Sequence, residues 1–399
     1  MARRFEKVLI DCSADIYEGS WQISSRNFPD WGGPQWSMTK FTLRGGKQHG
    51  VDVVELDNGE MTISVLPTRG MNVLHAVTDH ARLAWDSPLR EVIHPAYIEE
   101  GLRGGLGWLE GFNELMCRCG VESMGPPGPD VIIDNQGNKK TVMLSLHGRI
   151  SNTPASRLWL GVDLEPPHRL TVGGDVYDTR MFGPSYMLRT AISTLPGASE
   201  FTIDDEIRNL GGQPAPMEIL YHCNYGPPVL GEGARLVAPV RKVSARDHRA
   251  LDGMCHWDLY GPPETGFVEQ CYFFTLYADR QGRTCTALVN AEGDLAAAIR
   301  FSTRQLPCFT LWKNTASEAD GYVTGLEPGS AYPNPRQFER EKGRLRILEP
   351  GEVYKASLSM ALIRGRSEVK ELRGRIAALA KGKTPQVCSE IDPDMALAG

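Results

Sequence analysis

Three segments of the chain each end in a polar side chain next to a Gly or Pro turn, and together they could form a proton-transfer site. The polar residues are His147, His222 and Glu327, in segments 144–149, 219–228 and 322–329. The unperturbed pKa of His lies near neutrality, and a nearby carboxylate holds the imidazole protonated. A strand end fixes its side chain, and the following turn leaves room for a ligand. If these strand ends converge, we expect an acid/base set.

Each of these residues alone also has an ordinary structural explanation. A single His at a strand end is usually a hydrogen-bonded structural residue, and the Glu of a Glu-Pro-Gly turn usually faces solvent. The coincidence of three such strand ends in one chain is what favours a site.

The elements that must position these residues have the pattern of short strands. Apolar and polar residues alternate, which is the period of a half-buried strand, in segments 61–65, 142–146, 201–207, 217–222, 271–278, 295–301 and 356–363. Turns rich in Gly and Pro separate these segments. The sequence therefore predicts an all-β chain folded as a large antiparallel sandwich and not a parallel α/β sheet.

One helix is expected near the end of the chain. Val369, Leu372, Ile376 and Leu379 recur at helical spacing, and Ser367 could cap the start. The glycine-rich segment 97–114 is predicted to be a loop with a short helical turn. We divide the chain into an N-terminal β segment packed on the sandwich, the main sandwich with its cleft, and a helix with a tail, at residues 1–90, 91–365 and 366–399.

Composition excludes several classes of protein. The chain has 399 residues, of which 41% are hydrophobic and 23% charged, so wholesale disorder is excluded. A net charge of -6 argues against a nucleic-acid partner. We expect no membrane segment, because no apolar run approaches about 20 residues, and no secretory signal. Nine scattered cysteines suggest reduced thiols and a cytoplasmic protein.

No nucleotide or nicotinamide cofactor is expected. The glycine-rich stretch 101–107 lacks the GxGxxG spacing of a dinucleotide site and the Lys-Ser/Thr of a phosphate-binding loop.

The order of the three motifs resembles that of the galactose mutarotase (aldose 1-epimerase) superfamily. His147 stands in Leu-His-Gly, His222 in His-Cys-Asn-Tyr-Gly and Glu327 in Gly-Leu-Glu-Pro. Further similar stretches bring the resemblance to roughly residues 50–360, with 66–72, 306–313 and 348–352 among them. The chain looks like an uncharacterised aldose 1-epimerase-like branch. The resemblance implies a β-supersandwich with a cleft over one sheet.

The resemblance also implies roles for individual residues in the interconversion of sugar anomers. Glu327 would be the general base, His222 the general acid, and His147 a hydrogen-bonding partner of the sugar. Arg118 and Glu269 occupy the places where other members have an Arg and an acidic residue. The run from Cys223 to Gly226 departs from the aromatic-rich family pattern, so the sugar is left open.

Other polar and aromatic residues are candidates for binding the sugar. Hydroxyl groups could be bound by Arg149, Asn224, Lys313 and Arg69, and an apolar sugar face could pack on Trp312, Trp108 or Tyr225. The two tryptophans could equally belong to the core, and Arg69 could pair with a carboxylate on the first sheet.

Two other classes of function stay open. His147, His222, Glu269 and Glu327 together make a common N/O ligand set, so a metal-dependent sugar isomerase or epimerase is one alternative. A non-catalytic carbohydrate-binding protein is the other. The main expectation needs no metal and no other cofactor, and its partner is a small-molecule carbohydrate. Unprotected sheet edges make a homodimer an option.

Overall fold

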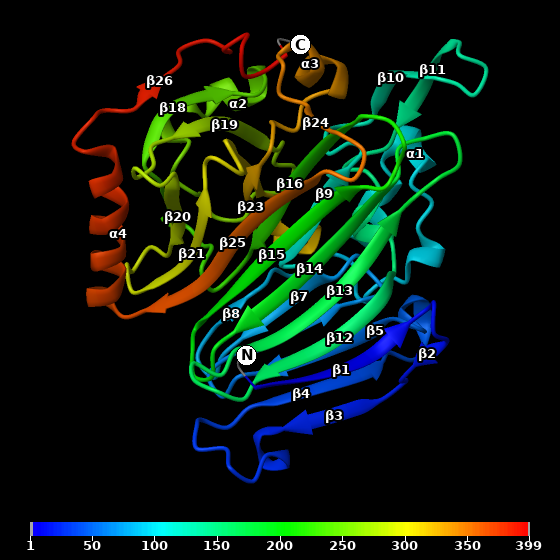
Figure 1. The fold of residues 1–399 in the computed structure, drawn as a ribbon. Helices are drawn as coiled ribbons and strands as arrows, with labels where there is room; N and C mark the ends of the chain where they lie inside the picture. Colours follow the sequence, from blue (N-terminus) through cyan, green and yellow to red (C-terminus); the bar gives the residue numbers. More distant parts are fainter. Residues whose placement is uncertain (1–2, 398–399) are drawn as a thin grey trace.

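The computed structural model describes residues 3–397, and two large, mainly antiparallel sheets dominate it. Figure 1 shows the two sheets packed face to face. The first sheet has 14 strands. In spatial order its main path is β26 (Gln386–Val387), β18 (Val240–Ala245), β19 (Gln270–Leu276), β22 (Cys308–Thr315), β23 (Tyr322–Gly329), β16 (Ala215–Tyr225), β9 (Met116–Val121), β7 (Asn72–Val77), β6 (Thr62–Leu66), β5 (Asp52–Asp57), β4 (Ser37–Thr42) and β3 (Trp21–Ser24). Off this path, β24 (Arg346–Leu348) pairs with β16, and β8 (Arg82–Leu83) pairs with β7.

The second sheet has 10 strands and covers one face of the first. In spatial order they are β17 (Arg235–Val237), β20 (Arg283–Val289), β21 (Leu295–Ser302), β25 (Val353–Arg364), β15 (Glu200–Asn209), β14 (Tyr186–Thr194), β13 (Leu170–Asp178), β12 (Ala155–Asp163), β1 (Arg4–Asp11) and β2 (Ile16–Tyr17). A separate hairpin is formed by β10 (Gly128–Ile133) and β11 (Lys139–Leu144). The predicted all-β supersandwich is therefore confirmed.

Helices are few and short. They are α1 (Leu102–Gly105), α2 (His248–Asp252), α3 (Arg336–Glu341) and α4 (Arg366–Ala380). The C-terminal helix predicted from the sequence is α4, and it packs Val369, Leu372 and Ile376 against the second sheet. Its N-cap is Gly365 and not Ser367. None of the described helices is both long and apolar enough to cross a membrane.

The segment 97–114 forms a loop with short helical turns, as expected. It contains α1 and the 3-10 turn Gly107–Gly111. Strands from the first 90 residues continue the sheet that holds the later ones, because Val73 of β7 pairs with Met116 of β9.

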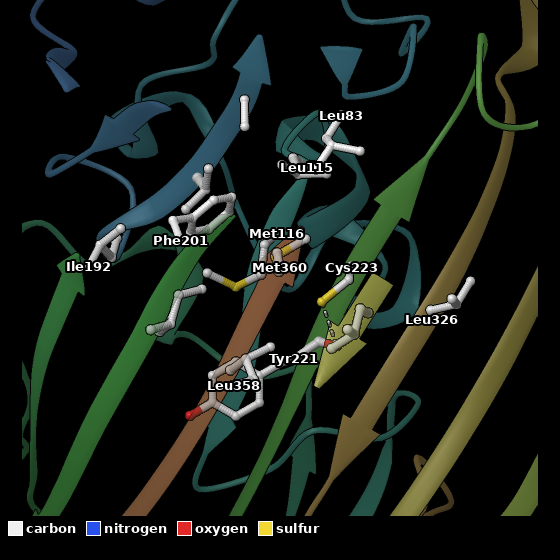
Figure 2. Packing of buried hydrophobic residues seen from close by; sticks show 14 of the residues in the cluster. Leu83, Leu115, Met116, Ile192, Phe201, Tyr221, Cys223, Leu326, Leu358 and Met360 are labelled. Carbon is white, nitrogen blue, oxygen red and sulfur yellow. Dashed lines mark hydrogen bonds between the residues drawn. The ribbon is translucent and has the colours of Figure 1, made fainter. Parts of the chain in front are cut away.

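Alternation along the central strands separates the core from the opposite, outer face of the first sheet. Tyr221 and Cys223 of β16 point between the two sheets, together with Leu326 of β23 (Figure 2). Successive side chains of a strand point to opposite faces, so His222 and Glu327 point away from the second sheet. The same alternation that builds the hydrophobic core therefore presents these two polar side chains on the outer face.

Candidate active site

A cavity of about 530 Å³ lies on the outer face of the first sheet. This volume falls in the usual range for small-molecule sites. Its lining comes from strands and loops far apart in sequence: Leu106, Trp108, Leu109, Phe112, Pro126, Pro127, Leu146, His147, His222, Arg246, Asp247, Glu269, Cys271, Trp312, Glu327, Pro333, Asn334, Pro335 and Leu397. Six residues considered for the site therefore share one cavity: Glu327, His222, His147, Glu269, Trp312 and Trp108.

His222 and Glu327 face each other across neighbouring strands. The register between β16 and β23 pairs Cys223 with Leu326 and Leu220 with Gly329, which sets His222 opposite Glu327. Both side chains are buried, and His222 Nε2 lies 3.2 Å from Glu327 Oε1. Glu327 Oε1 has no well-aligned hydrogen-bond partner among the described residues. The residue belongs to the lining of the cavity.

Gly325 makes room for this pair. It lies two residues before Glu327 on β23 and so on the same face of the sheet. A Cβ at this position would lie 2.3 Å from Glu327 Oε1 and 3.1 Å from His222 Cε1. The absence of a side chain at residue 325 is what lets the carboxyl group lie beside the imidazole.

Asn224 fixes the ring of His222. Its Oδ1 lies 2.6 Å from His222 Nδ1, and its Nδ2 donates to the carbonyl oxygens of Glu114 and His222 at 3.0 and 3.1 Å. Because the amide nitrogen is committed to two acceptors, the amide oxygen must accept the Nδ1 proton of His222. In the neutral ring, Nε2 then carries the lone pair that faces Glu327.

Burial moves the pKa values of the pair in opposite directions. It lowers the pKa of His222 to about 3, and the neighbouring His147 adds to this shift. It raises the pKa of Glu327 well above 4.5, with the charge of Glu269 adding to the effect. Both shifts disfavour the charged form. Both shifts favour a protonated Glu327 beside a neutral His222 in the ligand-free cavity, and not the protonated His222 expected from the sequence.

His147 enters the cavity from a tight turn. Its φ of 59° is left-handed, and Gly148 follows with a φ of 68°. A Cβ on residue 148 would lie 2.3 Å from the carbonyl oxygen of Ser123, so only glycine fits there. His147 Nδ1 lies 2.7 Å from the carbonyl oxygen of Met124 and donates to it. Burial lowers the pKa of His147 to about 4, so Nε2 is an acceptor near neutral pH.

Aromatic rings surround the two imidazoles. The His222 ring centroid lies 5.4 Å from that of His147, 5.3 Å from Phe112 and 5.4 Å from Trp312. Trp108 lies 4.7 Å from His147. Trp108 is 1% exposed. These rings exclude water and offer apolar faces to a ligand.

Beside Trp312 the cavity has a polar side. Glu269 Oε2 accepts a hydrogen bond of 2.7 Å from Trp312 Nε1, and its Oε1 accepts one of 3.0 Å from Arg246 Nη2. Arg246 Nε also donates to Asp247 Oδ2 at 2.7 Å. The guanidinium charge is therefore shared by two carboxylates. This side of the cavity offers hydrogen-bond donors and acceptors to hydroxyl groups. Arg246 is already paired with carboxylates and is not free to bind a phosphate.

Sequence reasoning did not identify Arg246 and Asp247. Asp247 caps α2, because its Oδ1 accepts a hydrogen bond from the backbone nitrogen of Ala250 at 2.9 Å. An Asp before a short helical turn is a recognisable cap signal. That signal would have located the helix start, although it would not have shown that Arg246 beside it lines a cavity.

Lys313 and Arg69, two candidate sugar ligands, do not line this cavity. Lys313 follows Trp312 on β22 and so points to the opposite face, where Nζ donates to the carbonyl oxygens of His256 and Leu259 at 3.2 and 2.7 Å. Arg69 is buried against Glu114, with 2.8 Å between its Nε and Oε1 of that residue. Arg69 thus takes the carboxylate pairing that the sequence offered as its other explanation.

Arg118 and Arg149 also lie outside the cavity. Arg118 points between the sheets, and its Nε and Nη2 donate to the two carboxylate oxygens of Asp205 at 2.6 and 3.0 Å. Arg149 is exposed, and its Nε lies 3.9 Å from Oε2 of Glu100. Asn224 is not a cavity-lining residue either, since its contacts are with His222 and the backbone. None of these three side chains is placed to touch a ligand in the cavity.

The arrangement does not favour the metal-dependent alternative. Among residues 3–397, no three His, Cys, Asp or Glu side chains are grouped so that they could hold a metal ion. His147, His222, Glu269 and Glu327 share the cavity, but they do not form such a group.

The fold is that of the galactose mutarotase-like proteins. A protein of Klebsiella pneumoniae subsp. pneumoniae with the provisional name aldose 1-epimerase is 35% identical, with a TM-score of 0.90 over 96% of this chain and 98% of its own. A family model matches residues 48–362, and the chain belongs to that family, described as Domain of unknown function (DUF4432). The C-terminal segment after residue 362 lies beyond the matched range.

More distant structures share the fold alone. A galactose mutarotase-like protein from Clostridium acetobutylicum is 14% identical, with a TM-score of 0.52 over 79% of this chain and 96% of its own. A galactose mutarotase related enzyme from Lactobacillus acidophilus is 12% identical, with a TM-score of 0.53 over 79% of this chain and 99% of its own. No curated protein matches the sequence significantly.

Proposed function

We propose that the chain is an isomerase that interconverts the anomers of an aldose by acid/base opening of its ring. The observation that carries the proposal is the buried pair of His222 Nε2 and Glu327 Oε1, 3.2 Å apart in a cavity of about 530 Å³. The provisional name of the Klebsiella relative supports the same class of reaction.

Ring opening needs a base at the anomeric hydroxyl and an acid at the ring oxygen. Transfer of the carboxyl proton from Glu327 to Nε2 of His222 gives a carboxylate and an imidazolium, and the total charge of the pair stays the same. Hydrogen bonds from sugar hydroxyls then stabilise the carboxylate that burial disfavours in the empty cavity. Glu327 is the base and His222 the acid.

The reaction then follows from this charge distribution. Glu327 takes the proton of the hydroxyl on C1, the C1–O5 bond breaks, and His222 gives its proton to O5. The aldehyde turns about the C1–C2 bond, and the ring closes on its other face with the two roles reversed. No atom or electron is gained or lost, so the reaction needs no redox cofactor.

The other residues of the cavity would hold the sugar. His147 Nε2 accepts a hydrogen bond from a hydroxyl, because its Nδ1 proton is committed to Met124. Glu269 and Arg246 bind hydroxyls on the polar side, while Trp312 packs against an apolar face of the ring. Rigid positioning of this kind lowers the barrier before any proton moves.

The test is the anomer-exchange rate, measured by NMR across a panel of aldoses with wild-type protein and Glu327→Gln. The variant keeps the shape of the side chain and loses the base. We expect its rate to fall by about 10²–10⁴-fold while sugar binding, followed by tryptophan fluorescence, is retained. Glu292→Gln, on an exposed loop, is the matched control and should exchange like wild type.

Two results would contradict the proposal. Wild-type protein that binds aldoses but accelerates the exchange of none would be a carbohydrate-binding protein. A Glu327→Gln variant with the full wild-type rate would show that the base lies elsewhere.

A further inference from the structure

The C-terminal segment 391–397 packs on the outer face of the first sheet beside the cavity. Figure 1 shows the red end of the chain running from β26 towards α3. Met395 and Ala396 are buried in a cluster with residues of β19, of β22 and of the loop after β23: Cys271, Phe273, Cys308 and Tyr332. The segment therefore covers part of the face that carries the acid/base pair.

Polar contacts fasten this segment at both sides. The backbone nitrogen of Asp392 donates to Ser244 Oγ at 2.9 Å, and its carboxylate pairs with Lys242 of β18. On the other side, Asn334 Nδ2 donates to the carbonyl oxygen of Met395 at 2.9 Å. The segment thus joins the strand that leads to Arg246 with the loop that holds Asn334, and both of these residues line the cavity.

Leu397 is where the segment reaches the cavity itself. It is 50% exposed and lines the cavity, as do Pro333 and Pro335. These three side chains have no hydrogen-bonding group. They give this part of the lining an apolar surface beside Asn334, on which a sugar hydroxyl would lose its hydrogen bonds with water and gain none.

The residues that the segment packs on indicate where the cavity would otherwise extend. Cys308 lies on the same face of β22 as Trp312, and Phe273 on the same face of β19 as Cys271, because each pair is an even number of residues apart. Trp312 and Cys271 line the cavity, whereas Cys308 and Phe273 lie under Met395 and Ala396. Without the segment, the cavity would continue along the sheet as an open groove.

We propose that residues 391–397 are a specificity-determining wall that limits the site to a sugar of one ring. The inference rests on the proposed function and adds the size of its substrate. A second ring on this side of the reducing sugar would need the space that Leu397 occupies. The wall therefore excludes oligosaccharides and admits monosaccharides.

The experiment compares kcat/KM for anomer exchange of a monosaccharide and of a disaccharide that ends in the same reducing ring, such as xylose and xylobiose or glucose and cellobiose. Wild-type protein should favour the monosaccharide strongly. Leu397→Ala should lower this preference severalfold, and a chain ending at Asp394 should lower it at least tenfold. Leu397→Trp should raise KM for the monosaccharide. Glu390→Ala, on the exposed approach to the segment, is the control and should behave like wild type.

Thermal unfolding shows whether the shortened chain folds. If it does not fold, the proposal is tested with Leu397→Ala and Leu397→Trp alone. A wild-type protein that exchanges both sugars equally, or Leu397 variants with an unchanged preference, would overturn the wall. Failure of the proposed function is distinguishable, because wild-type protein would then exchange neither sugar. In that case the wall is tested by sugar binding, measured by tryptophan fluorescence. Wild-type protein that binds the monosaccharide more tightly than the disaccharide, with this difference lost in Leu397→Ala, supports the wall. Equal binding of both sugars by wild type overturns it.

Discussion

Asn224 Oδ1 lies 2.6 Å from Nδ1 of His222 and decides which nitrogen of that ring faces Glu327. Asn224 is thus a positioning residue, which acts through His222 without touching the cavity. Asn224→Ala removes an acceptor that strengthens as the imidazolium forms. We expect kcat to fall by about 10- to 100-fold, the loss of roughly 1.5–3 kcal/mol for a charge-assisted hydrogen bond, with little change in KM.

The pH profile separates this role from a structural one. The pKa of His222 is lowered to about 3, so in wild type kcat/KM should decline only below about pH 4. Asn224→Asp puts a carboxylate beside the ring, stabilises the imidazolium and raises its pKa by about one to three units. The acid limb of the profile should move up accordingly. An acid limb that stays in place in Asn224→Asp would contradict this account.

The space at Gly325 makes a second prediction. In Gly325→Ala the new Cβ would lie 2.3 Å from Glu327 Oε1, so the carboxyl group must move away from His222. A small displacement of a reacting group costs about 10²-fold in rate. We expect kcat to fall by that order while the variant still folds.

Gly374→Ala is the matched control for this substitution. Gly374 lies within α4, where an added Cβ meets nothing within 4 Å. The variant should keep full activity and gain about 0.5–1 kcal/mol in free energy of unfolding, because alanine loses less backbone freedom in a helix. Equal activity in the two variants would mean that the position of the Glu327 carboxyl group is not critical.

The sequence predicts the fold and the central pair because both follow from alternation. Strand periodicity places Tyr221 in the core and His222 on the other face, and the turn after each strand indicates where a ligand has room. The same rule could have excluded one expectation. Trp312 and Lys313 are neighbours on one strand, so only one of them can line the cavity.

Other parts of the site depend on contacts that no local pattern reveals. Arg118 and Arg246 both follow or lie within strands, yet one is buried between the sheets and the other lines the cavity. What separates them is the position of their carboxylate partners, Asp205 and Glu269, and Asp205 stands 87 residues away from Arg118. The contribution of Leu397 depends likewise on how the chain returns to the first sheet after α4.

Arg118 gives a prediction about stability. Its guanidinium binds both carboxylate oxygens of Asp205 and also donates to Thr190 Oγ1 at 2.7 Å. Arg118→Met leaves the buried Asp205 with its hydrogen bond from Tyr221 but without a cation, which costs about 3–5 kcal/mol. Urea denaturation should show this loss, while KM for the sugar stays unchanged in the folded fraction. A raised KM with unaltered stability would show instead that Arg118 contacts the sugar.

Glu218 makes the stability of the protein depend on pH. It is buried, and neither carboxyl oxygen makes a well-aligned hydrogen bond with the described residues. The nearest cation is Arg336, whose Nε lies 3.6 Å away and whose Nη1 binds Asp130 at 2.7 Å. Burial raises the pKa of Glu218 from 4.5 to about 8.

The sign of the effect follows from where the proton is held. Between pH 4.5 and 8 the folded protein keeps the proton of Glu218 and the unfolded chain releases it. The contribution of Glu218 to the free energy of unfolding is therefore complete below pH 4.5. It is lost as the pH rises to 8, by at most roughly 1.4 kcal/mol per pH unit. Glu218→Gln cannot titrate and has nearly the same shape. Urea denaturation at pH 5 and pH 8 should show that the variant gains stability over wild type at the higher pH. A difference between the two proteins that is equal at both pH values would mean that Glu218 is ionised in the folded protein throughout, with Arg336 neutralising it.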